Sequence, residues 1–256
     1  MTDPDPPRRL PRPGGETIAF RAIPGRGPAV VFLGGFRSDM TGTKASALAE
    51  WAGATGRPFA RFDYFGHGAS TGDFLEGTIG RWIDDALALV DATTEGPLVL
   101  VGSSMGGWIA THVAIARPDR VRGLVTVAAA PDFTERLIWG GLDEGERAAL
   151  MKDGVRHEPS AYGEEPYPLA WKLVEEGRRH LLLDRPVPVA VPARLHHGLA
   201  DADVPWGLSV ELAERMVSAD AVVTLVKGGD HRLSGPADIA RLIADVDALA
   251  KAAASS

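Results

Sequence analysis

Cysteine is absent from the 256-residue chain. Its absence excludes a disulfide framework, a thiolate metal site and a cysteine nucleophile. It is compatible with a reducing compartment. Any covalent catalysis by this chain must therefore use a different nucleophile.

Long hydrophobic runs and an excess of positive charge are also absent. No apolar run approaches the roughly 20 residues of a transmembrane helix. The formal net charge of −7 argues against nucleic acid as a partner, because phosphate binding needs clustered basic residues. The N-terminus, rich in proline and with acidic residues, lacks the apolar centre of a signal peptide. We therefore expect no membrane span, no nucleic-acid partner and a flexible tail over residues 1–15.

The chain also lacks the common cofactor motifs. It contains no phosphate-binding loop, no dinucleotide fingerprint and no H-E-x-x-H zinc motif. The expected chemistry accordingly needs neither a cofactor nor a metal. Arginine is preferred over lysine and alanine is abundant, as in proteins encoded by GC-rich bacterial genomes. With no targeting segment recognised, these features predict a cytoplasmic, bacterial protein.

Short apolar runs alternate with amphipathic stretches along most of the chain. This alternation predicts a single α/β domain with a mostly parallel sheet and helices on both faces. The stretch 17–23 has β character and is expected to belong to an initial antiparallel hairpin. The expected parallel strands lie at 28–33, 58–64, 98–101, 121–129, 193–197 and 221–226, and the helices at 43–55, 78–93, 108–116, 208–217 and 236–250.

The alternation stops after Pro131. From Asp132 to about Val187 the chain shows helical stretches and no obvious strand. We interpret residues 132–187 as a small helical lid inserted between core segments 16–131 and 188–252. An irregular surface connection without a binding role is the alternative. The apolar residues expected on the underside of the lid, facing a substrate acyl chain, are Phe133, Leu137, Trp139, Trp171 and Leu173.

The stretch 98–108 carries the strongest chemical signal. An apolar strand runs into Gly102-Ser-Ser104-Met-Gly106, which matches G-x-S-x-G, and a helix follows. This strand, turn and helix form the setting of a nucleophile elbow, in which Ser104 is the nucleophile. Glycine on both sides allows the strand and helix to pass close together. A glycine- and serine-rich turn without chemistry is the alternative interpretation.

A serine nucleophile needs a base and an acid, and both should follow strands on the same sheet edge. His231 follows the last apolar strand and two glycines, and is the best candidate base. Asp201 and Asp203 both follow the preceding strand. We favour Asp201 as the acid, since Asp203 is well placed to cap the helix near Pro205.

The oxyanion of an acyl-transfer reaction needs two N–H donors. Met105, directly after the nucleophile, should supply one. The loop after the early strand should supply the other, from Phe36 or alternatively Gly35. Asp63 and His67 follow another strand and are expected to order the loop beside the site.

At these residues the chain resembles α/β-hydrolase-fold serine hydrolases. More narrowly, it is similar to a mitochondrial branch of that fold that hydrolyses acyl glucuronides and S-palmitoyl proteins. The resemblance spans roughly residues 31–249, and its motif positions include Ser104, Asp201 and His231. It implies an α/β-hydrolase fold and cofactor-free hydrolysis of small-molecule esters or S-acylated substrates. The N-terminus departs from the branch because it lacks a targeting presequence. The segments that carry the resemblance are Gly35-Phe36, Met40-Thr-Gly-Thr-Lys-Ala45, Arg61-Phe-Asp-Tyr64, Val101-Gly-Ser-Ser-Met-Gly-Gly-Trp108, Ala114-Ile-Ala-Arg-Pro118, His197-Gly198, Val204-Pro-Trp206 and Asp230-His-Arg232.

The leading hypothesis is therefore a serine esterase or thioesterase. A second hypothesis keeps the three residues but places them on a C–C or peptide bond. A third is a non-catalytic binding protein on the same scaffold, because a fold does not imply a function.

Overall fold

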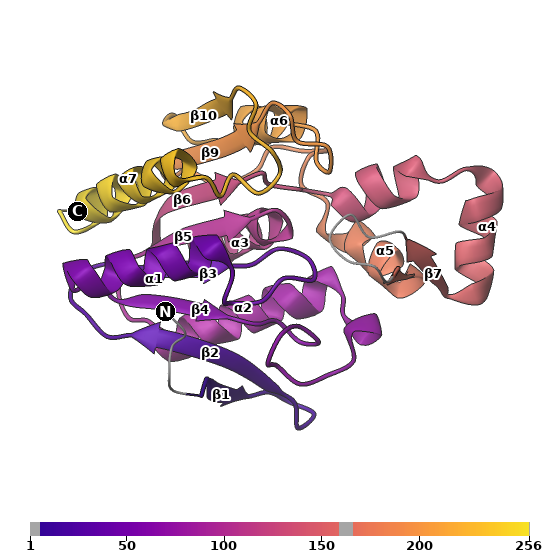
Figure 1. Cartoon of the computed structure of the whole chain (residues 1–256), viewed down its shortest axis with the longest axis horizontal. Coiled ribbons are helices and arrows are strands. Elements are labelled where there is room, and N and C mark those ends of the chain that lie inside the picture. The colour runs from indigo at the N-terminus through magenta and orange to yellow at the C-terminus, as the bar shows by residue number, and fades with distance from the viewer. Residues whose placement is uncertain (1–5, 159–165, 256) are drawn as a thin grey trace.

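A computed structural model describes residues 6–158 and 166–255. Its centre is an eight-stranded sheet in the order β1-β2-β4-β3-β5-β6-β9-β10 (Figure 1). From β4 to β10 neighbouring strands are parallel, whereas β1 and β2 pair antiparallel at one edge. The predicted mostly parallel sheet is thus confirmed. The strands are β1 (Arg8–Pro11), β2 (Thr17–Ile23), β3 (Ala29–Leu33), β4 (Phe59–Phe62), β5 (Leu98–Ser103), β6 (Val121–Val127), β9 (Ala193–Gly198) and β10 (Ala221–Val226).

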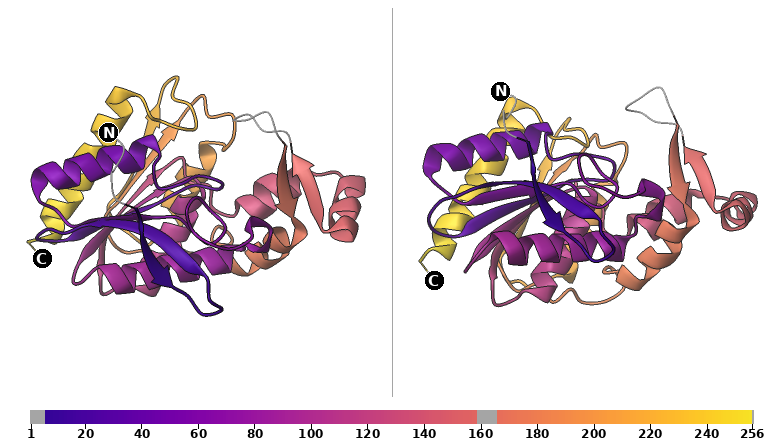
Figure 2. Two further views of the ribbon diagram at one scale, coloured as in Figure 1. Left: turned by 60° about the horizontal axis from the view of Figure 1, so that its bottom comes forward. Right: turned by 90° about the horizontal axis from the view of Figure 1, so that it is seen from below.

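Helices cover both faces of this sheet (Figure 2). Successive residues of a strand point to opposite faces, so Val30 and Val31 pack into two different hydrophobic clusters. Helices α1 and α7 close one face, and α2, α3 and α6 close the other. The continuous apolar runs predicted strands because both faces are buried. The helices are α1 (Thr43–Thr55), α2 (Ile79–Thr93), α3 (Met105–Ala116), α6 (Gly207–Arg215) and α7 (Pro236–Ala253), with a short 3₁₀ helix η1 (Phe74–Glu76) before α2.

The N-terminal segment differs from the expected flexible tail. Residues 8–11 form strand β1, and all four of them pair with residues 17–20 of β2. Arg12 then donates from Nε to the buried carboxylate of Asp85, over 3.2 Å. These contacts join residues far apart in the sequence, which explains why local composition indicated a tail. Residues 1–5 lie outside the described residues.

The insertion, residues 132–187, projects beyond one end of the sheet (Figure 1). The expectation that it contains no strand is wrong, because β7 and β8 form an antiparallel pair. Its two ends meet at Asp132, whose carboxylate accepts the backbone N–H groups of Leu182 and Leu183 at 2.8 and 2.9 Å. Its elements are the π-helical η2 (Thr134–Trp139), α4 (Glu144–Asp153), β7 (Val155–Glu158), β8 (Tyr167–Ala170), α5 (Trp171–Gly177) and η3 (Arg178–His180).

Across residues 6–158 and 166–255, no helix has the length and hydrophobicity needed to cross a membrane.

Candidate active site

The loop between β5 and α3 is a sharp turn centred on Ser104. Ser104 has a φ of 55°, a left-handed value that is unusual for a residue with a side chain. Close packing around it requires glycine. A Cβ on Gly102 would overlap the backbone of Gly106, and a Cβ on Gly106 would overlap the carbonyl oxygen of Leu33. The strained serine between two obligatory glycines is the geometry of a nucleophile elbow.

The structure brings Ser104, His231 and Asp201 together from three loops at the carboxyl ends of β5, β9 and β10. His231 Nε2 lies 3.1 Å from Ser104 Oγ, and His231 Nδ1 lies 2.8 Å from Asp201 Oδ2. The carboxylate places the ring proton on Nδ1, which leaves the Nε2 lone pair facing the serine hydroxyl. This arrangement can remove a proton from Ser104 and stabilise the resulting imidazolium.

Asp201 is held from behind by His197, a residue that the sequence analysis did not select. His197 Nε2 lies 3.1 Å from Asp201 Oδ2 and 3.0 Å from the carbonyl oxygen of Val204. Because the carboxylate and the carbonyl oxygen can only accept a hydrogen bond, Nε2 of His197 carries the proton. The other nitrogen of His197 lies 2.7 Å from Ser209 Oγ. The sequence feature that could have indicated this contact is the four-residue spacing between His197 and Asp201 across the end of a strand.

These contacts keep Asp201 ionised although its side chain is fully buried. Burial by itself would raise the pKa of Asp201. Hydrogen bonds from His197, from His231 and from the backbone N–H of Val204 outweigh burial, so the pKa of Asp201 lies well below its usual range. Asp201 therefore presents an ionised carboxylate to His231 near neutral pH.

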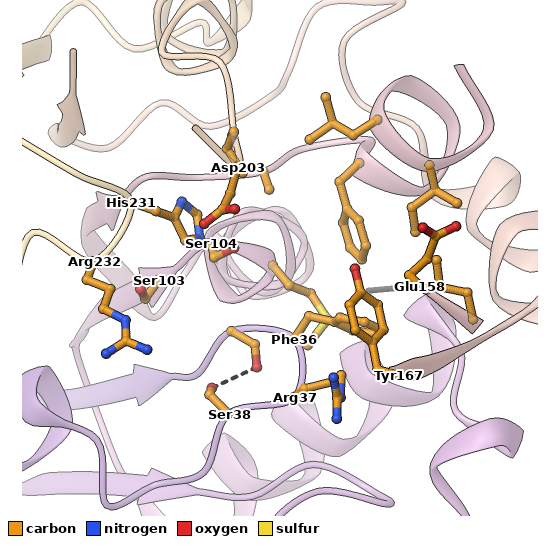
Figure 3. Close-up of a pocket in the computed structure, with 18 of the residues that line it drawn as sticks. Phe36, Arg37, Ser38, Ser103, Ser104, Glu158, Tyr167, Asp203, His231 and Arg232 are labelled. Atoms are coloured by element: carbon orange, nitrogen blue, oxygen red, sulfur yellow. Dashed lines mark hydrogen bonds between the residues drawn. The ribbon is translucent and has the colours of Figure 1, made fainter. Parts of the chain in front are cut away.

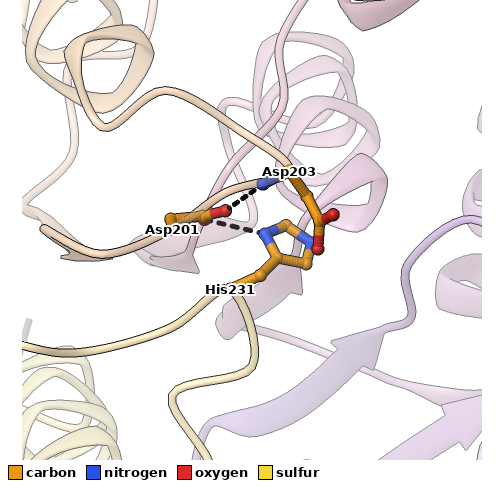
Figure 4. Close-up of side chains that lie close together, drawn as sticks. All are labelled: Asp201, Asp203 and His231. Atoms are coloured by element: carbon orange, nitrogen blue, oxygen red, sulfur yellow. Dashed lines mark hydrogen bonds and ion pairs between the residues drawn. The ribbon is translucent and has the colours of Figure 1, made fainter. Parts of the chain in front are cut away.

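Asp203 does not cap α6 as expected. The helix begins at Gly207 without a side-chain cap, and Asp203 lines the cavity in front of Ser104 instead. Figure 4 shows Asp201 and Asp203 on either side of His231. Ligand atoms of these three residues lie within 4.8 Å of one another, as in many metal sites. Both oxygens of Asp201 already accept hydrogen bonds, however, so these contacts favour the charge-relay arrangement.

The residues expected to bind the oxyanion lie beside Ser104. Met105 is the first residue of α3, so its backbone N–H has no acceptor within the helix. Phe36 lies in the loop after β3. Gly35, the residue before Phe36, lies so close to Ser104 that a Cβ on Gly35 would be 3.3 Å from Ser104 Cβ. Both Phe36 and Met105 line the cavity that contains Ser104.

That cavity has a volume of about 1160 Å³ (Figure 3). Its floor comes from the sheet loops and its roof from the insertion. The insertion lines it with apolar residues and also with charged ones, namely Glu146, Arg156 and Glu158. The loops of the core add Asp39, Lys44 and Arg232. The apolar lining includes Phe36, Met105, Ala130, Phe133, Leu137, Ile138, Leu142 and Leu169.

The expected underside of the insertion is correct only in part. Phe133 and Leu137 line the cavity, as expected. Trp139, Trp171 and Leu173 are not among the described residues that line it. The two tryptophans pack on each other, with ring centroids 5.1 Å apart, and Arg178 lies over both rings. The sequence showed an apolar insertion but not which of its side chains point inward.

Asp63 and His67 have structural contacts, as expected. The Asp63 carboxylate accepts the N–H groups of Met40 and Ala69, at 2.6 and 2.8 Å, and so joins the two loops beside the site. His67 is buried among aromatic rings with Nδ1 3.1 Å from the Phe65 carbonyl oxygen. Burial lowers the pKa of His67 to about 4, so it is neutral at physiological pH.

Comparisons with known proteins agree with this architecture. A family model described as serine aminopeptidase, S33, matches residues 27–150. The mitochondrial palmitoyl-protein thioesterase ABHD10 of Bos taurus is 42% identical over 246 residues, covering 94% of this chain and 78% of the relative. The human protein of the same name is 41% identical, with the same coverage of each chain.

Two solved structures match nearly the whole chain. Mouse alpha/beta hydrolase domain-containing protein 10 superimposes with a TM-score of 0.88 at 39% identity, covering 95% of this chain and 97% of its own. A putative hydrolase from Agrobacterium vitis superimposes with a TM-score of 0.91 at 39% identity, covering 95% and 98%. The α/β-hydrolase fold is thereby confirmed.

The predicted localisation in a bacterial cytoplasm is contradicted by these comparisons, because the relatives that match 94% of the chain are named as mitochondrial proteins of mammals. Amino-acid composition reflects codon usage and solubility. The compartment of a protein cannot be inferred from the composition of its folded hydrolase domain. The non-catalytic hypothesis is also set aside, since the relatives are named as thioesterases. The chain is an ester or thioester hydrolase, and it belongs to the ABHD10 family of α/β-hydrolase-fold enzymes.

Proposed function

We propose that this chain hydrolyses long-chain S-acyl thioesters and related acyl esters, with Ser104 as nucleophile, His231 as general base and Asp201 as the group that orients His231. The observation that carries the proposal is the continuous relay from Asp201 through His231 to Ser104, at 2.8 and 3.1 Å, beside a partly apolar cavity.

The reaction proceeds in two halves. In the first, Ser104 Oγ attacks the acyl carbonyl carbon while His231 Nε2 takes the hydroxyl proton. The N–H groups of Phe36 and Met105 bind the oxyanion of the tetrahedral intermediate. The C–S or C–O bond then breaks, and His231 returns the proton to the leaving thiolate or alkoxide. In the second half, water activated by His231 attacks the acyl-enzyme and releases the carboxylic acid and Ser104.

The size and lining of the cavity favour a long acyl chain as part of the substrate. Its volume of about 1160 Å³ exceeds the roughly 300–1,000 Å³ typical of sites for drug-sized ligands. Phe133, Leu137 and Leu142 of the insertion contribute apolar side chains to its lining. We therefore assign residues 132–187 the role of a lid over the acyl chain. The name of the relatives, palmitoyl-protein thioesterase, supports the same substrate class.

A fluorophosphonate probe and a substrate panel test the proposal together. The probe should label Ser104, as identified by peptide mapping. Activity should be highest for long-chain acyl thioesters in a panel that also contains p-nitrophenyl esters, acyl glucuronides and peptide amides. Absence of labelling in folded protein would refute the nucleophile assignment. A clear preference for amides would instead support the peptide-bond hypothesis.

A further inference from the structure

The lid contacts the loop that carries the oxyanion donor, as well as covering the cavity. Phe36 is the centre of an aromatic cluster in which it meets Phe74 and Trp82 from the core, with ring centroids 5.1 and 5.9 Å away. It also meets Phe133 and Tyr167 from the lid, at 5.6 and 6.5 Å. The side chain of one oxyanion residue is thus enclosed by rings from both parts of the molecule.

The residue after Phe36 is held by the lid as well. Arg37 places its guanidinium over the Tyr167 ring, 4.7 Å from the ring centroid, and Figure 3 shows the two side chains stacked beside Phe36. Tyr167 is the first residue of β8 and pairs with Glu158 of β7. The β7–β8 hairpin therefore reaches down to the oxyanion loop.

This contact falls on a strained point of the backbone. Residues 35–38 form a tight turn in which Ser38 N and Ser38 Oγ both donate to the Gly35 carbonyl oxygen, at 3.2 and 2.8 Å. Arg37, the third residue of that turn, has a φ of 57°. This position of a type II turn usually requires glycine, because a left-handed conformation costs an L-residue free energy. Contacts of the Arg37 side chain must offset that cost.

We propose that Tyr167 is a positioning residue, which holds Arg37 in its left-handed conformation and thereby presents the Phe36 N–H to the oxyanion. The inference rests on the proposed function, since it assumes that Ser104 reacts and that Phe36 is a donor. It extends that function by making the lid part of the chemical step. A lid that only selected acyl chains would leave the turnover of short esters unchanged.

Tyr167→Ala should lower kcat for an acetyl p-nitrophenyl ester by about tenfold to a hundredfold with little change in KM, because a misplaced donor stabilises the transition state less well. Tyr167→Phe keeps the ring under the guanidinium and should restore kcat to within about twofold of wild type. Trp139→Ala is the matched control, since it removes an aromatic ring of the lid outside the cavity. It should leave kcat for the acetyl ester unchanged.

A second pair of variants separates positioning from damage to the fold. Arg37→Ala keeps the left-handed strain and loses the stacking, so kcat should fall as in Tyr167→Ala. Arg37→Gly removes the strain. In the Arg37→Gly background, Tyr167→Ala should change kcat by less than about twofold, because the effect of Tyr167 is coupled to the strain at Arg37 and is not additive with its removal.

Fluorophosphonate labelling of Ser104 in the wild-type protein is measured alongside these variants, so that the proposed function is tested separately. Labelled Ser104 with an unchanged kcat in Tyr167→Ala would overturn this inference alone. Equal losses from Tyr167→Ala in the wild-type and Arg37→Gly backgrounds would also overturn it, and would indicate a structural role. Unlabelled Ser104 would refute the proposed function, and this inference with it.

Discussion

The floor and the roof of the active-site cavity are stabilised by different interactions. The floor contains the turn of the proposed nucleophile, where Ser104 N donates to the Val127 carbonyl oxygen at 2.9 Å beside the fully buried strand β5. The roof is the lid, whose own cluster of buried apolar residues is Leu142, Leu150 and Val174. Phe133 and Leu173 of the lid also pack in the main hydrophobic core, and Asp132 joins the two ends of the insertion. Surface ion pairs such as Arg136 to Glu211 add little to this attachment.

Under the proposed function, this difference separates the chemical step from the choice of substrate. The reacting groups need fixed geometry, and the buried sheet loops provide it. Recognition of an acyl chain tolerates a less rigid wall, because apolar contact is non-directional. Variants of the floor should therefore affect kcat, and most variants of the roof should affect binding and stability. The contact of Tyr167 with Arg37 is the proposed exception.

Ser104→Ala should give the largest effect. It removes the nucleophilic oxygen and should reduce kcat by about 10⁶, the usual cost of losing such a serine. The unfolding temperature should stay nearly the same, because the backbone of the elbow is unchanged. Steady-state kinetics and thermal denaturation measure the two quantities. Ser103→Ala should cost far less, and a reversed order would identify Ser103 as the nucleophile.

Asp201→Asn should rank second, with a loss in kcat of about 10⁴. The amide can donate to His231 Nδ1 and thereby favour the tautomer that cannot accept a proton from Ser104. Asp203→Asn is the matched control in the same loop and should cost far less. The comparison needs kcat at a pH near neutrality, where the pKa of Asp201 keeps the carboxylate ionised. Greater damage from Asp203→Asn would reassign the acid.

Asp132→Ala tests the attachment of the lid. The variant leaves the N–H groups of Leu182 and Leu183 without their acceptor, and each unpaired buried donor costs on the order of 1–3 kcal/mol. Burial raises the pKa of Asp132, which reduces the net benefit of the carboxylate. We expect a loss of about 2–3 kcal/mol in the free energy of unfolding, measured with urea. Asp184→Ala, at an exposed position, should change it by less than about 0.5 kcal/mol.

Leu137→Ala should give the smallest effect, visible only as a change in slope. Each acyl methylene buried beneath the lid contributes about 0.8 kcal/mol, close to fourfold in kcat/KM. Removing Leu137 from the cavity should flatten the increase of kcat/KM from acetyl to long-chain p-nitrophenyl esters. Trp139→Ala should preserve that slope, because Trp139 packs on Trp171 away from the cavity. A slope that depends on Trp139 and not on Leu137 would place the acyl chain elsewhere.

Local patterns were sufficient for the core and for the elbow. Continuous apolar runs indicated strands buried on both faces, and G-x-S-x-G between a strand and a helix indicated the tight turn at Ser104. The steric reason is local, since a Cβ at Gly102 or Gly106 would overlap nearby backbone. The positions of Asp201 and His231 could be inferred because parallel strands end at one edge of a sheet.

Only the tertiary structure decided the features that depend on distant contacts. Strand β1 exists because β2 offers it a partner, and His197 supports Asp201 because the chain after β9 turns back on itself. The inward side of the lid was likewise undetermined, because short irregular helices have no single period that separates Leu137 from Trp139. The stacking of Arg37 on Tyr167 joins residues 130 positions apart, and a sequence pattern cannot show such a contact.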